Sequence, residues 1–340
     1  MVGIVFIKCR LFKCVSSKIH AKYMKLSIII PAFKVAPYIF ECLLSVLCQK
    51  TNFDFEVIVC DDASTDSTYK IINYLASSYP NLVVLKNELN LGLVATMKRL
   101  LESVKGQYIA YLDGDDVALP GKLQLQVDYL DANPLCSMVY HESDMFDSVS
   151  GNTIKYYSRD FYNAHYIPQK ATIDHLVKYT VFLQASSIMF RRYPAFIDAL
   201  AHGNNIICDY PWHIRNIGLN PGTIDRIDNV FGRYRVHNSS FGGQTQCNPN
   251  RRIQVTDELI HACKHSQFFG VNEDTVQFGI NHIYFSAALY FLKMGMVEHF
   301  QSMLGKSAEK ELYFDKRHEF ALKHINAPEK VMQHLGWQNG

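Results

Sequence analysis

The stretch "GQYIAYLDGDD" spans residues 106–116 and ends in three carboxylates within four positions. Its segment "QYIAYL" (107–112) is apolar or aromatic at every position after Gln107, which predicts a buried strand. Like charges that crowd together raise the energy of their ionised state unless a positive group lies among them. The acids therefore indicate either a site that receives a positive partner or a solvated acidic turn with no further role.

Three further strands are expected before this one, with helix-length segments between them. They are "LSIII" (26–30), "FEVIVC" (55–60) and "LVVLK" (82–86). In the intervening segment 66–79, apolar residues recur at helical spacing. Strands that alternate with helices predict βαβ units with right-handed crossovers and a mainly parallel sheet.

Polar or turn-forming residues follow three of these strands directly. Pro31, Ala32 and Phe33 follow the first, Asp61 and Asp62 the second, and the acidic turn the fourth. Ligands bind at the carboxyl ends of the strands in open α/β sheets, so these residues are expected to form one site. Mg²⁺ is commonly held by one or two carboxylates together with substrate phosphates, and such an ion is a suitable counter-charge. A simpler alternative for the pair at 61–62 is capping of the helix that starts near residue 66.

The composition excludes several classes of protein. The chain has 340 residues, of which 48% are hydrophobic and 19% charged, as is typical of a folded globular protein. Its net charge of +2 is too small to indicate a nucleic-acid partner. The nine cysteines include no CxxC pair, so neither a disulfide framework nor a zinc site is expected, and free thiols suit the cytoplasm.

Five stretches resemble the motifs of family 2 glycosyltransferases, a group of inverting enzymes with the GT-A fold. They are "LSIIIPAFKVAPYIFECLLSVLCQ" (26–49), "FEVIVCDDASTDST" (55–68), "NLGL" (90–93), "GQYIAYLDGDDVALPGKL" (106–123) and "ASSIMFRR" (185–192). The resemblance covers about residues 25–240. It implies an α/β fold in which a Rossmann-like mixed sheet is flanked by helices.

The resemblance also implies roles for individual residues. The implied contacts to a nucleotide-sugar donor, most often a UDP-sugar, come from Pro31, Ala32, Phe33, Asp62, Asn90, Gly92, Asp113, Gly114 and Asp115. Asp62 matches the acid that reads the nucleotide base. Asp113 and Asp115 match the outer acids of the DxD motif, which with His237 would hold Mg²⁺ or Mn²⁺. Gly114 keeps the turn between the two acids free of side-chain bulk.

Asp209 in "NNIICDYPWHIRN" (204–216) matches the position of the catalytic base. Its alternative role is to cap the helix that begins before Pro211. Two positions depart from the family pattern. Cys208 stands where many relatives have Glu, and Met97 stands where an Arg is common, so Lys98 or Arg99 is a candidate to replace it.

The division of the chain is expected to be threefold. Residues 1–24 are expected to be a disordered basic leader, or to precede the start that is used; residues 25–245 form the GT-A domain and residues 253–340 a helical C-terminal extension. Gly242 and Gly243 predict a flexible loop that closes over the donor, and "CNPNRR" (247–252) predicts a linker. The apolar region 278–300 is interrupted by polar residues and predicts a buried helix, not a membrane span.

These expectations describe an inverting glycosyltransferase in cell-surface polysaccharide biosynthesis, which moves a sugar to a hydroxyl of a glycan or lipid-linked acceptor. It would work in the cytoplasm or at the inner face of the membrane, and peripheral membrane association and oligomeric state stay open. The alternative is a catalytically silent module that binds sugar nucleotides or glycans. A nucleotidyltransferase is less favoured because "PAFKVAPY" after the first strand lacks a glycine- and lysine-rich turn, and an oxidoreductase because it lacks GxGxxG.

Overall fold

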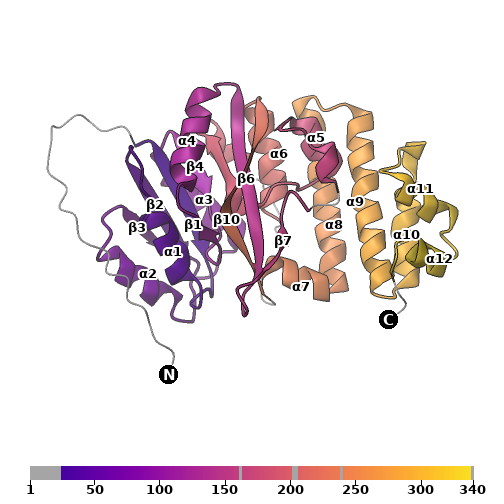
Figure 1. Cartoon of the computed structure of the whole chain (residues 1–340), viewed down its shortest axis with the longest axis horizontal. Helices are drawn as coiled ribbons and strands as arrows, with labels where there is room; N and C mark the ends of the chain where they lie inside the picture. The colour runs from indigo at the N-terminus through magenta and orange to yellow at the C-terminus, as the bar shows by residue number, and fades with distance from the viewer. Residues whose placement is uncertain (1–23, 161–162, 201–205, 238–239, 338–340) are drawn as a thin grey trace.

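The structure, a computed structural model, describes residues 24–160, 163–200, 206–237 and 240–337. In this part of the chain one sheet contains ten strands (Figure 1). They are β1 (Leu26–Ala32), β2 (Phe55–Asp61), β3 (Leu82–Lys86), β4 (Tyr108–Tyr111), β5 (Val117–Ala118), β6 (Cys136–Asp147), β7 (Thr153–Tyr156), β8 (Lys170–Ala171), β9 (Ile188–Arg191) and β10 (Thr223–Val236). Their order is β3-β2-β1-β4-β9-β6-β10-β5, with β7 beside β6 and β8 beside β10.

The N-terminal half is parallel and buried on both faces. Strands β3, β2, β1 and β4 pair in parallel, and helices α1 (Ile39–Leu47), α2 (Thr68–Ala76) and α3 (Leu93–Glu102) connect them. Ile29 packs in one core cluster with Met97, whereas Ile28 and Ile30 pack in a second cluster with Leu43. A strand that is covered on both faces needs the continuous apolar run predicted for it. Each buried isoleucine contributes about 1.5–3 kcal/mol.

The second half makes the sheet mixed, as the resemblance implied. Strand β9 pairs antiparallel with both β4 and β6, and β10 pairs in parallel with β6. The start of β9 and the end of β10 therefore lie at the same sheet edge as the carboxyl ends of β1, β2 and β4. Helices α4 (Lys122–Ala132), α5 (Ile173–Tyr179) and α6 (Asp209–Leu219) belong to this half.

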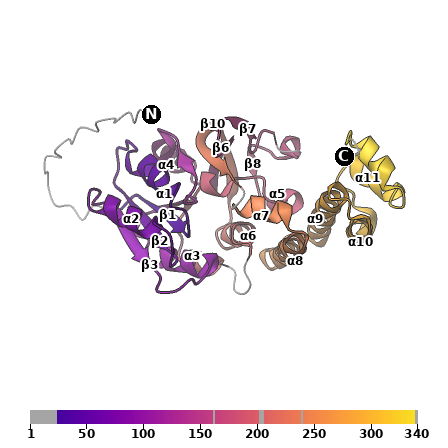
Figure 2. The same ribbon diagram turned by 90° about the horizontal axis from the view of Figure 1, so that it is seen from below.

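A helical region extends from one side of the sheet (Figures 1 and 2). It contains α7 (Phe241–Cys247), α8 (Pro249–His265), α9 (Glu273–Lys293), α10 (Val297–Lys306), α11 (Lys316–Lys323) and α12 (Pro328–His334). Short 3₁₀ turns occur in the sheet domain at Ala164–Tyr166, Ala185–Ser187 and Phe196–Ala199, and in the helical region at Ser266–Phe269 and Glu309–Glu311. Helix α9 contributes Ile280 to the core of the sheet domain and Phe291 to a separate helical core. This two-sided burial explains its weak amphipathic pattern. The buried helix predicted over 278–300 is confirmed as far as Lys293, but residues 294–296 form a turn and Val297 begins α10.

Two expectations about the segment that joins the sheet domain to the helical region are wrong. Gly242 and Gly243 lie in helix α7 and not in a loop, because the Ser240 side chain caps the helix by accepting from the Gly243 N–H. The predicted linker at 247–252 contains only a brief break, since Asn248 caps α8 and Pro249 begins it.

The expected leader at residues 1–24 lies outside the described residues except for Met24. Among the described helices, none combines the length and the apolar character that crossing a bilayer requires.

Candidate active site

Two adjoining cavities lie where strands β1, β2 and β4 end. The outer cavity has a volume of about 630 Å³. The residues predicted to bind the donor and the metal all line it: Pro31, Ala32, Phe33, Asp62, Asn90, Gly92, Asp113, Gly114, Asp115 and His237. The inner cavity, of about 150 Å³, is lined by Asp209 and mainly apolar side chains. Asp113 and Leu93 line both cavities, so the two cavities are parts of one site.

Asp113 and Asp115 are held by different neighbours. Asp115 Oδ2 lies 2.9 Å from His237 Nε2. The Asp113 N–H donates to Ser186 Oγ at 2.9 Å, and the Tyr111 hydroxyl donates to the Asp113 carboxylate. The antiparallel direction of β9 places Ser186, just before that strand, beside the end of β4.

Asp116, the third acid of the turn, is buried and supports the other two. Its Oδ2 accepts from Ser186 Oγ at 2.6 Å and from Gln184 Nε2 at 2.9 Å, and its Oδ1 accepts from the Arg235 N–H at 2.9 Å. Its side chain is 1% exposed, and burial raises its pKa well above the ordinary value. The carboxylate thus ties the turn after β4 to the segment before β9 and to the end of β10.

Arg235 supplies a positive charge to the acidic turn. Its Nε donates to the Asp115 carbonyl oxygen at 2.8 Å, and its Nη2 donates to Glu41 Oε2 at 2.5 Å. The guanidinium lies over the Tyr38 and Phe146 rings, 4.8 and 4.6 Å from their centroids. This packing leaves Arg235 6% exposed, and its bond to the Asp115 carbonyl oxygen holds the acidic turn in place.

Gly114 allows the turn to pass close to strand β1. A Cβ atom at this position would lie 3.1 Å from the Pro31 carbonyl oxygen and 3.3 Å from Val35 Cγ2. Both contacts are tighter than ordinary side-chain packing, and the first involves backbone that cannot easily move. The structure therefore gives a steric reason for glycine between the two acids.

Asp62 organises the loop before helix α3 and does not cap α2. Its Oδ1 accepts from Asn87 Nδ2 at 2.7 Å and from the Leu91 N–H at 2.8 Å, and its Oδ2 accepts from the Gly92 N–H at 2.9 Å. Gly92 has a φ of +81°, which favours glycine at this turn. Ser67 is the N-cap of α2 and makes no side-chain cap bond, whereas Asp66 Oδ1 accepts from the Thr68 N–H at 3.0 Å.

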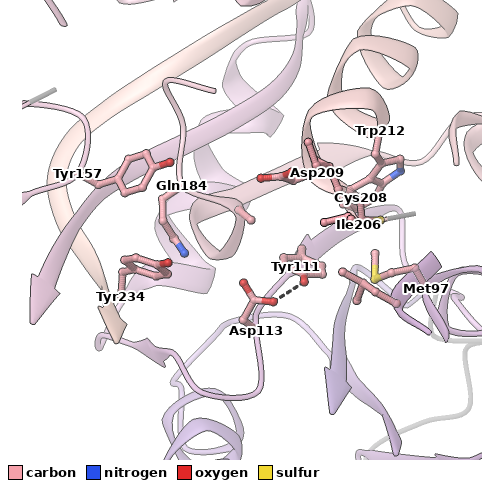
Figure 3. Close-up of a pocket in the computed structure, with 13 residues that line it drawn as sticks. Met97, Tyr111, Asp113, Tyr157, Gln184, Ile206, Cys208, Asp209, Trp212 and Tyr234 are labelled. Carbon is pink, nitrogen blue, oxygen red and sulfur yellow. Dashed lines mark hydrogen bonds between the residues drawn. The ribbon is translucent and has the colours of Figure 1, made fainter. Parts of the chain in front are cut away.

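Asp209 begins helix α6 and lines the inner cavity together with Asp113 (Figure 3). Its Oδ1 accepts from the Tyr210 N–H at 2.8 Å. The adjacent Cys208 also lines the cavity, and Met97 forms part of its apolar wall. The capping alternative is wrong, because Cys208 is the N-cap of α6 and Asp209 is its first residue. Asp209 shares the inner cavity with Asp113, the predicted metal acid.

The three acids that face the cavities share a low-dielectric setting. Burial, with a further contribution from the Asp115 carboxylate, raises the pKa of Asp113 to about 7. Burial also raises the pKa of Asp209. Buried acids that raise one another's pKa are an arrangement in which a bound positive ion is favourable.

The donor set of the outer cavity fits a hard divalent cation that also binds phosphate oxygens. Asp113 and Asp115 offer carboxylate oxygens to the same cavity, and His237 Nε2 lies beside Asp115. In the part of the chain that the structure describes, no three His, Cys, Asp or Glu side chains form a ready metal cage. A cation that takes its other ligands from water and a substrate diphosphate does not need such a cage.

Two basic residues near the site in the sequence, Arg99 and Arg215 (six residues after Asp209), contact other parts of the structure. Arg215 donates to the Asp198 carbonyl oxygen at 2.6 Å and contacts His265 Nε2 at 2.7 Å. Arg99, a candidate to replace the missing arginine at position 97, donates to the Lys86 carbonyl oxygen at 2.7 Å and to Asn87 Oδ1 at 2.5 Å. Both therefore support loops near the site and do not line either cavity.

Sequence reasoning missed the supporting roles of Asp116, Gln184 and Ser186. Arg235, two residues before His237 in "YRVH" (234–237), is a weak candidate from sequence. The other three act through contacts between β4, β9 and β10, which no local sequence pattern predicts.

Comparisons with solved structures support the fold. S. aureus TarS (residues 1–349, in complex with UDP-GlcNAc) has a TM-score of 0.66 and 17% identity and covers 93% of each chain. A mannosyltransferase of Pyrobaculum calidifontis, in complex with GDP-Man and Mn²⁺, has a TM-score of 0.58 and 15% identity, with coverage of 93% of this chain and 88% of that one. These likenesses confirm the predicted GT-A architecture, and their coverage extends into the C-terminal helices.

Comparisons of sequence identify the family. An uncharacterized protein of Mycobacterium tuberculosis is 31% identical over 219 residues, which is 62% of this chain and 59% of that protein. The chain thus spans less than two thirds of the length of this relative. The family described as glycosyl transferase family 2 matches residues 27–198, just over half of the chain. Strands β2 to β9, the acidic turn and the loop before α3 fall within that match, and the chain belongs to glycosyl transferase family 2.

Proposed function

We propose that this protein is an inverting glycosyltransferase that moves a sugar from a nucleoside diphosphate donor, a UDP-sugar in the first instance, to a hydroxyl of a glycan or lipid-linked acceptor. The carrying observation is that Asp113 lines both cavities, so the predicted donor residues and Asp209 belong to one continuous site. TarS binds UDP-GlcNAc and the Pyrobaculum enzyme binds GDP-Man, which supports a nucleotide-sugar donor of this kind.

The nucleotide would lie in the outer cavity. Phe33 is 43% exposed and lines this cavity, so its ring is available to stack against a base. Asp62 Oδ2 has the Gly92 N–H as its hydrogen-bond donor and can accept a further N–H, such as one from a pyrimidine ring. The diphosphate would then lie near Asp113 and Asp115.

The residues present fit a divalent cation, Mg²⁺ or Mn²⁺, held by Asp113 and Asp115 with His237 beside them. When bound, such a cation neutralises the charge that develops on the leaving diphosphate. The Mn²⁺ in the Pyrobaculum enzyme supports a cation of this class.

Asp209 would act as the general base. The acceptor oxygen attacks the anomeric carbon as the bond from that carbon to the diphosphate oxygen breaks, and the hydroxyl proton passes to Asp209. Because its Oδ1 accepts from the Tyr210 N–H, Oδ2 is the atom that would take the proton. Burial raises the pKa of Asp209, which makes the carboxylate a stronger base at neutral pH.

A catalytically silent binding module is not favoured. A binding module would not need a second acid in the cavity that Asp113 lines, yet Asp209 lines that cavity too. The division into a transferase domain at 25–245 and a helical extension at 253–340 stays a prediction, as do the role in cell-surface polysaccharide biosynthesis and the location in the cytoplasm or at the inner face of a membrane.

The direct test is a panel of UDP- and GDP-sugars incubated with the full chain and Mn²⁺. We expect metal-dependent release of the nucleoside diphosphate from at least one donor, slow with water and faster with a matched acceptor. Binding of donors without any hydrolysis or transfer would favour the silent module, and no binding at all would reject the proposal.

A further inference from the structure

Helices α7 and α8, which lie beyond the segment matched by the family, form part of the wall of the outer cavity. Gln244 of α7 and Arg251 of α8 line it together with Asp115 and His237. Gln244 and Arg251 also line a neighbouring surface cavity between the two helices. The helical region therefore takes part in the site and is not only packed against the sheet domain.

Local contacts fix the position of Arg251. The Asn248 side chain caps α8 and accepts from the Arg251 N–H at 3.1 Å. Arg251 Nε donates to Thr245 Oγ1 at 3.2 Å. These two contacts set the start of α8 and hold the side chain at the cavity wall, so little rotational freedom is lost when a ligand arrives.

The charges of the outer cavity leave a place for an anion. The carboxylates that line it belong to Asp62, Asp113 and Asp115, and the long basic side chains to Lys34 and Arg251. The Asp62 carboxylate already receives three N–H donors, as described above. With a divalent cation bound, the cation and the two basic side chains carry four positive charges against three carboxylates, so the cavity favours an anion.

We infer that Arg251 binds the phosphates of the donor diphosphate, so that helix α8 supplies a diphosphate contact from outside the family-matched segment. The inference rests on the proposed function, since it takes the diphosphate of a sugar nucleotide as the ligand. Arginine suits this role because its planar guanidinium pairs with phosphate oxygens through two parallel hydrogen bonds.

Titration calorimetry of the full chain tests the inference. The probes are UDP and GDP with Mn²⁺, with uridine and guanosine as controls that lack phosphate. Arg251→Gln is compared with Arg251→Lys, which keeps the charge, and with Arg252→Gln as the matched control. Arg252 is the next residue of the same helix but donates to Ser286 Oγ at 3.1 Å and lies over the Tyr290 ring, away from the outer cavity.

For whichever nucleotide the wild-type protein binds, we expect Arg251→Gln to weaken diphosphate binding on the order of 10-fold or more. The lysine variant should recover part of that loss. Nucleoside binding should be unchanged, and Arg252→Gln should bind the diphosphate like the wild-type protein. Thermal unfolding of each variant verifies that it is folded.

Equal diphosphate affinity for Arg251→Gln and wild-type protein would overturn the inference and leave the proposed function standing. An equal loss with the nucleosides would also overturn it, since the effect would then not depend on phosphate. If the wild-type protein binds neither diphosphate, the proposed function and the inference are both overturned.

Discussion

Asp113 and Asp209 line the same inner cavity, although one follows strand β4 and the other begins helix α6 (Figure 3). Burial is the main cause of the raised pKa of Asp113, and the Asp115 and Asp209 carboxylates add to it. Asp113 lines both cavities, whereas Asp209 lines only the inner one. Substitutions should therefore separate donor binding from transfer.

Asp209→Asn should lose transfer and keep donor binding. The amide has nearly the shape of the carboxylate but cannot take the acceptor proton, so we expect kcat to fall by about 10²–10⁴. Donor affinity, measured by calorimetry with Mn²⁺, should stay unchanged because Asp209 does not line the outer cavity. Asp228→Asn is a suitable control, since that carboxylate is 67% exposed on β10. Wild-type turnover by Asp209→Asn would reject the assignment of the base.

Asp115→Asn should abolish the dependence of donor binding on the metal. In the wild-type protein a donor at 100 times its Kd, with Mn²⁺, should stabilise the fold by about 2.7 kcal/mol. The variant should show little of this stabilisation, because the amide is a weaker cation ligand than the carboxylate. Thermal shift with and without Mn²⁺ measures the difference. Full metal-dependent stabilisation of the variant would contradict the proposed metal site.

Asp116→Ala should destabilise the fold, in contrast to its neighbour. Removing this buried acceptor leaves Ser186, Gln184 and the Arg235 N–H without their partner, so a loss of about 3 kcal/mol or more is expected. Urea unfolding measures it. Asp115→Ala is the matched control, because that side chain is partly exposed and its removal costs only the contact to His237, so a smaller loss of unfolding free energy is expected. Equal stability of the two variants would show that Asp116 has no such supporting role.

The sequence predicted the parts of the site that lie at the ends of parallel strands. Asp62 and Asp113 follow apolar runs whose spacing implies parallel pairing, and parallel pairing brings strand ends to one edge. Gly114 could also be interpreted from sequence because two ligands one residue apart require a tight turn. These inferences depend only on local pattern and on the handedness of βαβ units.

The supporting residues could not be predicted in the same way. Ser186 reaches Asp113 only because β9 runs antiparallel to β4, and Arg235 reaches the turn only because β10 extends parallel to β6. Neither direction can be read from apolar periodicity. The two glycines of α7 were predicted as a loop from their intrinsic flexibility, but the Ser240 cap and the packing of α7 on α8 stabilise a helix there.

Two buried histidines should make the C-terminal helices sensitive to acid. His282 stacks on Phe314 with ring centroids 4.1 Å apart, and His318 stacks on Phe285 at 4.3 Å. Burial lowers the pKa of each histidine from 6.5 to about 4. The unfolded chain therefore binds more protons between these two values, so stability is fully present above pH 6.5 and falls as the pH drops toward 4. Each histidine accounts for roughly 3 kcal/mol of this fall.

Thermal unfolding between pH 7.5 and about 4 measures the effect. His282→Gln removes one of the titrating groups, so its unfolding free energy should fall less steeply with acid than that of the wild-type protein, even if it is lower at neutral pH. His261→Gln is the control, because His261 is exposed on α8 and should leave the slope unchanged. The slope, not the absolute stability, separates titration from lost packing: a parallel curve for His282→Gln would mean that protonation of this histidine does not drive the acid instability.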